Sequence, residues 1–403
     1  MFKKYRMLII LTILVVVIAI STTFCYKQYN NFIFNSAIEE AAKINSDIWD
    51  KKYQDNKIRN NYKVVFITNN GGEFTYAKYF KYAAEKIGWE VQIYYAQILG
   101  HEAEILKFDP DFIIFSQFIK ATISTELNAH RSKKYLLSFS SIDALRNRFK
   151  WIDLSNPYQP IKELKELISM VHGVLTIAPQ LDFYRIMFEK MNKPFNGLKL
   201  LPLVPKFNNE PAEPKSLMWL SGGWDKFRSS SNYKKFISLL SENIPMRVYG
   251  HYNSSSYLKP HIYAGYIPPG IENIQAIRKN GIYLLTHSNI HFQGGETNMR
   301  GFEAAAANAI VISDKHPFIL ENFGDSFFYF DHDVDSETMY KQVKAHIDWI
   351  KENPEKAKAM AEKAHKIYLE KFTIEADLIR IAKMHENVIN QEREMALQYN
   401  LGY

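Results

Sequence analysis

The stretch from 282 to 312 constrains the fold of this chain more than any other. An apolar segment at 282–285 leads into a polar, glycine-containing loop at 286–299, then into an alanine-rich segment at about 300–308, and the apolar residues 310–312 follow. This order predicts a strand, a loop, a helix and a second strand, which together form a βαβ unit. The loop then lies at the carboxyl end of a parallel sheet, where such folds bind ligands.

The start of the predicted helix suits an anion and a sugar. The first backbone N–H groups of a helix have no partner within it, so together with Arg300 they suit a phosphate or a diphosphate. Glu303, one turn further on, can accept hydrogen bonds from sugar hydroxyls. An ordinary βαβ unit with an incidental arginine and glutamate is the alternative interpretation.

The run from Asn298 to the strand at 309–312 resembles the nucleotide-sugar motif of group 1 glycosyltransferases. The CgeB-like branch, with the pattern N-x-R-x-F-E-A-x-A-x-G, is the most similar, and Asn298, Arg300 and Glu303 stand at motif positions. The resemblance implies that this segment binds a nucleotide-sugar, with Thr297, Asn298 and Glu303 as binding residues and Arg300 neutralising the leaving diphosphate.

Two departures from the motif concern its glycine and its glutamates. Asn308 stands where the motif has its last glycine. Retaining relatives place two glutamates eight positions apart, whereas Glu296 lies seven positions before Glu303. The second glutamate is therefore matched, and retention or inversion at the sugar stays open.

The resemblance implies a GT-B fold, an α/β protein with two Rossmann-like domains that face a cleft. The first half of the chain agrees, because strand-like runs alternate with helical and polar segments there, as in parallel, doubly wound sheets. We predict an acceptor-side domain over 62–205. Its strand-like runs lie at 62–68, 89–95, 112–115, 135–137 and 174–177.

Two loops of this first domain carry candidate site residues. Gly71 and Gly72 follow the first strand, and relatives use this loop to bring the first domain toward the sugar and the acceptor. Asp143 follows the strand at 135–137. Many relatives carry a catalytic His or Asp after the corresponding strand, so Asp143 is the candidate base. A helix N-cap is the alternative role for Asp143.

The boundary of the second domain is marked by prolines. Four of them lie between 202 and 214 among polar residues, which predicts an extended linker at 206–216. We predict a nucleotide-sugar-binding domain at 217–375. The resemblance implies that the last segment, 376–403, returns to the first domain as a helix.

The loop after the first strand of the second domain is basic. Gly222 and Gly223 are followed by Lys226 and Arg228. In relatives a basic residue at this place reaches the donor diphosphate, so Lys226 and Arg228 are candidate catalytic residues, and the two glycines are candidate binding residues. A solvated positive turn is the alternative.

A later tyrosine pair is the candidate site for the nucleotide base. Tyr263 and Tyr266 lie where relatives often bind the base, and either ring can stack on it. A tyrosine packed in the core is an equal alternative.

We predict no metal site. The single cysteine, Cys25, excludes a site built from several cysteines. Asp109 and Asp111 form a D-x-D pattern, but a turn before a strand explains it better. His287 and His291 are four apart, yet they are expected at a strand end and in its loop instead of on one helix face.

The N-terminus predicts a membrane anchor. Residues 7–26 are apolar and uncharged, long enough to cross a bilayer, and basic residues precede them. A cleaved signal peptide is the alternative. We predict a single-pass anchor with a cytosolic N-terminus, and a stem, or a first helix of the catalytic body, at 27–61. Lysines after the anchor weaken the charge asymmetry, so the side of the catalytic domain stays open.

These features predict a metal-independent, hexosyltransferase-type enzyme that moves a sugar from a UDP- or GDP-type nucleotide-sugar to a glycan, lipid or protein acceptor. The formal net charge of +7 favours anionic partners, and no nucleic-acid-binding motif is present. Two alternatives stay open. One is another GT-B enzyme, such as a sugar-nucleotide epimerase or an exostosin-like transferase. The other is a non-catalytic, membrane-tethered GT-B protein.

Overall fold

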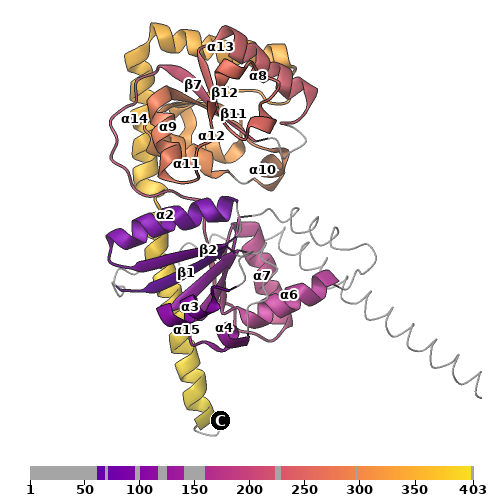
Figure 1. Ribbon diagram of the computed structural model, residues 1–403, viewed down its shortest axis with the longest axis vertical. Coiled ribbons are helices and arrows are strands. Elements are labelled where there is room, and N and C mark those ends of the chain that lie inside the picture. The colour runs from indigo at the N-terminus through magenta and orange to yellow at the C-terminus, as the bar shows by residue number, and fades with distance from the viewer. Residues whose placement is uncertain are drawn as a thin grey trace, which may run out of the picture.

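The computed structural model describes residues 61–68, 71–95, 100–116, 125–139, 159–222, 228–295 and 297–400. Within these ranges the chain forms two α/β domains, each built on a six-stranded sheet (Figure 1). Every pair of neighbouring strands in both sheets is parallel. The expectation of two parallel α/β domains is confirmed.

The first sheet has the strand order β2-β1-β3-β4-β5-β6. All five strand-like runs found in the sequence are strands, and β6 is an addition that the sequence pattern did not indicate. The elements of this domain are β1 Lys63–Thr68, α2 Gly72–Lys86, β2 Glu90–Tyr95, α3 Glu102–Phe108, β3 Phe112–Ser116, α4 Thr125–Ala129, β4 Lys133–Ser138, α6 Gln159–Met170, β5 Gly173–Thr176, α7 Ala178–Lys190 and β6 Gly197–Lys199.

The strands of the first sheet are apolar because both of their faces are covered. Side chains alternate between the two faces along a strand. Val64 and Phe66 of β1 pack into a core with α2, whereas Val65 between them packs into a second core with Phe183 and Met187 of α7. A continuous apolar run is therefore what the sequence needs at a central strand of a parallel sheet.

The second sheet has the strand order β12-β11-β10-β7-β8-β9. Its elements are β7 Ser216–Ser221, α8 Ser231–Asn243, β8 Met246–Gly250, η2 Tyr252–Ser254, η3 Pro260–Ile262, β9 Tyr263–Gly265, α9 Ile271–Asn280, β10 Gly281–Leu285, α10 Asn289–Gly294, α11 Met299–Ala306, β11 Ile310–Asp314, α12 Pro317–Phe323, η4 Gly324–Ser326, β12 Phe328–Phe330, α13 Ser336–Glu352 and α14 Pro354–Lys371.

The stretch from β10 to β11 is the predicted βαβ unit, with two differences. The strands pair in parallel, and Ile282 lies opposite Ile310. The loop between β10 and α11 is not wholly irregular, because it contains the short helix α10. The second helix ends at Ala306, two residues earlier than expected.

Asn308 has a positive φ of 51° at the end of α11. Asparagine and glycine are the residues that enter this left-handed conformation most readily. The replacement of the motif glycine by Asn308 therefore keeps the backbone turn that leads into β11. The side chain also donates a hydrogen bond from Nδ2 to the carbonyl oxygen of Asn209, at 2.8 Å.

The last helix, α15 Ile374–Asn400, lies against the first domain (Figure 1). Glu386 accepts a hydrogen bond from the hydroxyl of Tyr62 at 2.8 Å, and the ring of His385 lies 2.9 Å from the hydroxyl of Tyr135. Just before the helix, Thr373 forms an isolated parallel bridge with Val204. The two chain segments that connect the domains are therefore paired with each other.

The predicted anchor at 7–26 and the predicted stem at 27–61, apart from its last residue, lie outside the described residues. Among the helices that the structure describes, none combines the length and the apolar character needed to cross a bilayer.

Candidate functional site

A cavity of about 250 Å³ lies at the carboxyl ends of β7 and β10, where α2 of the first domain faces the second. It brings together six of the candidate site residues: Gly72, Gly222, Arg228, Asn298, Arg300 and Glu303. Its other lining residues are Thr75, Leu220, Ser221, Tyr283, Leu284, Thr286, His291 and Met299.

The start of α11 is fixed by its capping residue. Asn298 is the N-cap, and its Oδ1 accepts a hydrogen bond from the backbone N–H of Arg300 at 2.9 Å. Its Nδ2 donates to the carbonyl oxygen of Thr286 at the end of β10, at 3.2 Å. One side chain thus caps the helix and ties it to the neighbouring strand, which sets where the helix start meets the cavity.

Small residues let α11 lie close to the sheet. A Cβ added at Gly301 would meet Ile319 at 3.1 Å and Leu285 at 3.3 Å, which is tighter than ordinary contact. The alanines at 304–307 are fully buried. The position of the helix start is therefore supported by close packing along the helix as well as by the cap.

Glu303 is fully buried and holds three partners. Its Oε1 accepts a hydrogen bond from the hydroxyl of Tyr79 at 2.8 Å. Its Oε2 accepts from Nδ2 of Asn273 at 2.5 Å and from Nη1 of Arg300 at 3.2 Å. Tyr79 belongs to α2, so this carboxylate joins the first domain to the second.

Tyr79 acts as a donor in this contact. Burial, and then the neighbouring carboxylate of Glu303, raise the pKa of Tyr79 well above its ordinary value. Its hydroxyl therefore keeps its proton and donates it toward Glu303. The same hydroxyl oxygen lies 2.9 Å from the carbonyl oxygen of Gly270.

Two arginines give the cavity its positive charge. Arg300 pairs with Glu303, but 38% of its side chain stays exposed. Arg228 enters the cavity from the loop after β7. Since a guanidinium stays protonated at any physiological pH, both positions are permanently cationic. An anion is the ligand that such a cavity favours.

The candidates Asp143, Gly223 and Lys226 lie outside the described residues, as does Glu296. Their proposed roles stay predictions.

Tyr263, Tyr266 and Gly71 are not among the residues that line the cavity. The hydroxyl of Tyr263 donates to the carbonyl oxygen of Gly250 at 2.8 Å. Tyr266 is 52% exposed, and its ring centre lies 5.3 Å from that of His251. Gly71 is the N-cap of α2, next to Gly72. The ring of Tyr266 thus contacts His251, and stacking on a base stays a prediction for both tyrosines.

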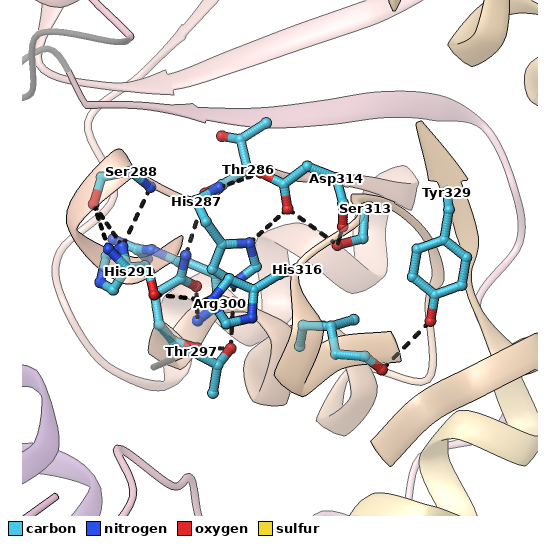
Figure 2. A network of polar contacts seen from close by, with 12 residues as sticks. Thr286, His287, Ser288, His291, Thr297, Arg300, Ser313, Asp314, His316 and Tyr329 are labelled. Atoms are coloured by element: carbon cyan, nitrogen blue, oxygen red, sulfur yellow. Dashed lines mark hydrogen bonds and ion pairs between the residues drawn. The ribbon is translucent and has the colours of Figure 1, made fainter. Parts of the chain in front are cut away.

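A buried pair behind the cavity was not foreseen from the sequence (Figure 2). His287 and Asp314 are 0% and 1% exposed, and Nδ1 of the histidine lies 2.6 Å from Oδ1 of the aspartate. The backbone N–H of His287 donates to Oδ2, also at 2.6 Å. Nε2 of His287 lies 3.3 Å from Oγ1 of Thr297. The pair therefore holds Thr297 behind the cap of α11.

The charge of Asp314 is kept by its partner. Burial alone would raise the pKa of its carboxyl group, but the charge and the hydrogen bonds of His287 outweigh burial, and the pKa is lowered. The parallel register of β10 and β11 explains why His287 and Asp314 meet, and the sequence analysis did not use it. Leu285 lies opposite Ser313, so the residues that follow each of them meet at the sheet edge.

Both aspartates of the D-x-D pattern have partners in the structure. Asp109 pairs with Arg131 at 2.7 Å, and Asp111 accepts a hydrogen bond from the backbone N–H of Lys63 at 2.8 Å. In the ranges that the structure describes, no three His, Cys, Asp or Glu side chains are grouped to hold a metal ion.

Several solved structures have a similar backbone arrangement at low sequence identity. They include the sucrose-phosphate synthase of Thermosynechococcus elongatus, with a TM-score of 0.49 and 10% identity over 85% of this chain and 100% of that one. A glycosyltransferase of Rickettsia africae has a TM-score of 0.47 and 10% identity over 82% of this chain and 99% of that one. HepE of Anabaena in complex with UDP has a TM-score of 0.42 and 11% identity over 82% of this chain and 100% of that one.

All three TM-scores lie below 0.5, and all three identities are 11% or lower. No curated protein sequence matches the chain.

Most of the second domain matches the model of a known protein family. The matched segment begins at Arg228, includes the whole βαβ unit with Asn298, Arg300 and Glu303, and ends within α15. It thus contains both arginines of the cavity. Residues 228–383 of this chain match the family model described as "Glycosyl transferase-like".

Proposed function

We propose that the protein is a glycosyltransferase that moves a sugar from a UDP- or GDP-type nucleotide-sugar to a glycan, lipid or protein acceptor. One observation carries the proposal. The cavity between the domains combines Arg228, Arg300 and the capped start of α11, and all three belong to the segment that matches the glycosyl transferase-like family. Two cations and a helix start suit the diphosphate of a nucleotide-sugar.

The reaction needs charge stabilisation at one place. The bond between the anomeric carbon and the phosphate oxygen breaks, and its electron pair stays on the diphosphate. The acceptor oxygen forms the new bond to that carbon and releases its proton. Arg228, Arg300 and the start of α11 line one cavity, and we propose that they stabilise the negative charge that grows on the leaving group. These groups supply the positive charge that a metal ion provides in other transferases.

The acceptor side is assigned to the first domain. Gly72 and Thr75 form the wall of the cavity that faces the second domain. Among the described residues, those two have small side chains, which leaves room for an acceptor hydroxyl to approach. Glu303, which is fully buried with its partners, is proposed to orient Arg300. The membrane anchor at 7–26, the CgeB-like subgroup and hexosyl specificity belong to the same proposal.

The test is release of UDP or GDP from a panel of nucleotide-hexoses, measured with EDTA present. We expect one donor class to be turned over without added metal. Arg300→Ala and Arg228→Ala should lower the rate by about 100-fold or more, as loss of one charge-stabilising group typically does.

Arg247→Ala is the matched control, because this arginine belongs to β8 and donates to the carbonyl oxygen of His261 instead of lining the cavity. Equal rates for all three variants would contradict the proposal. An epimerised donor found as the product would show instead that the enzyme is a sugar-nucleotide epimerase.

A further inference from the structure

Three histidines lie together beside the cavity, and their rings are engaged differently (Figure 2). His287 uses Nδ1 on Asp314 and has Nε2 against Thr297. His316 stacks on His287 with ring centres 4.2 Å apart, and its Nε2 lies 3.2 Å from the carbonyl oxygen of His291. Of the three, His291 is the one that lines the cavity.

The hydrogen bonds of His291 fix which ring nitrogen carries the proton. The backbone N–H of Ser288 points at Nδ1 of His291 at 3.3 Å, and a backbone N–H can only donate. The hydroxyl of Ser288 lies 2.8 Å from the same nitrogen. Nδ1 is therefore the acceptor, and in the neutral ring the proton sits on Nε2. The ring thus presents an N–H donor on the side away from Ser288.

His291 is also held in its neutral form. Burial, and then the neighbouring His287, Arg228 and His316, lower its pKa from 6.5 to about 3, while Asp314 opposes them. A neutral ring beside Arg228 and Arg300 adds a hydrogen-bond donor to the cavity without adding a third charge.

We propose that Nε2–H of His291 donates a hydrogen bond to the terminal phosphate of a nucleoside diphosphate bound in this cavity. The inference rests on the proposed function, which places a diphosphate there. The two arginines supply charge, and the histidine supplies a donor in a fixed direction. The phosphate next to the sugar is the one whose oxygen gains charge as the sugar leaves, so a donor placed there acts on the reacting end of the donor substrate.

The local fold offers well-matched variants. Ser288 and His291 form a capping box at the start of α10, in which each caps the backbone of the other. Glutamine and glutamate are the usual residues at the second position of such a box. His291→Gln keeps the box and retains N–H groups to donate. His291→Glu keeps the box but replaces the donor with a negative charge, and His291→Leu removes donor and box together.

The experiment compares the binding of UDP or GDP with that of UMP or GMP by calorimetry. For the diphosphate that the wild type binds, His291→Leu should weaken binding about tenfold or more, as loss of a hydrogen bond to a charged group does. His291→Gln should stay within about threefold of wild type, and His291→Glu should bind least of all, because a carboxylate repels the phosphate. The monophosphate should bind each neutral variant as it binds wild type.

His261→Leu is the control, since this histidine is exposed and lies away from the cavity. Circular dichroism checks that each variant is folded. If His291→Leu does not fold, the Gln and Glu pair decides: equal diphosphate binding by both would overturn the inference. So would a His291→Leu variant that binds UDP or GDP like wild type, or that loses diphosphate and monophosphate equally. A folded wild type that binds neither diphosphate removes the proposed function as well.

Discussion

Arg300 and Glu303 are only three residues apart, yet the partners that fix them come from three different elements. Asn298 caps the helix, Asn273 of α9 donates to the carboxylate, and Tyr79 reaches it from the first domain. The spacing of the motif was sufficient to find Asn298, Arg300 and Glu303. It could not reveal Tyr79, which lies 224 positions away in the sequence from its partner.

The neutral state of His291 predicts a dependence of stability on pH. Its pKa is lowered to about 3 in the folded protein, mainly by burial and then by His287, Arg228 and His316, with Asp314 opposing. In the unfolded chain the ring takes up a proton near pH 6.5. Its contribution to stability is therefore complete above pH 6.5 and is lost as the pH falls toward 3.

We expect the wild type to lose about 1–2 kcal/mol more of its unfolding free energy than His291→Gln between pH 7 and pH 5. Urea unfolding at the two pH values measures this difference. His261→Gln, a change at an exposed histidine, should follow the wild type. If His291→Gln showed the same pH dependence as wild type, the ring would not be held neutral in the folded protein.

Among the elements, the strands were the easiest to predict and the short helices the hardest. The buried central strands are continuous apolar runs, so composition and length identify them. The three residues of β6, from Gly197 to Lys199, and the six of α10 are too short to carry a periodic pattern. The placement of α10 depends on the capping box of Ser288 and His291, whose second member is a histidine instead of the usual Glu or Gln.

The end of α11 offers a test of why the motif tolerates asparagine. Asn308 is 2% exposed, has a positive φ and donates to Asn209. Asn308→Gly keeps the backbone freedom but loses the hydrogen bond, so it should cost about 1 kcal/mol. Asn308→Ala also loses the freedom to adopt positive φ, so it should cost roughly 1 kcal/mol more.

Thermal and urea unfolding of the two variants should therefore give the order wild type, glycine, alanine, from most to least stable. An alanine variant as stable as the glycine variant would show that backbone conformation does not decide this position.

At the scale of the whole molecule, one contact between the domains is polar and passes through Glu303. The sequence predicted two domains and a linker, because apolar alternation and prolines are local patterns. It did not predict that Tyr79 and Glu303 meet, since that contact depends on how the two domains are placed after each has folded. The hydroxyl of Tyr79 and the carboxylate of Glu303 are both buried, so their separation would leave polar groups unpaired.

Tyr79→Phe should therefore destabilise the protein by about 1–2 kcal/mol and increase amide hydrogen exchange in α2 and α9. Tyr82→Phe is the control on the same helix. Its ring stacks on Phe207, with ring centres 5.6 Å apart, and packing of this kind does not need the hydroxyl. Equal unfolding free energies and equal exchange in the two variants would show that the hydroxyl of Tyr79 does not hold the domains together.

The central claim is that the cavity between the domains binds the diphosphate of a nucleotide-sugar. Calorimetric titration of UDP and GDP onto wild type, Arg300→Ala and Arg247→Ala tests it most directly. We predict saturable binding of one nucleotide, weakened about tenfold or more by Arg300→Ala, as expected for loss of a charged hydrogen-bonding partner, and unchanged by Arg247→Ala. A folded wild-type protein that binds neither nucleotide, or binding that Arg300→Ala leaves intact, would contradict it.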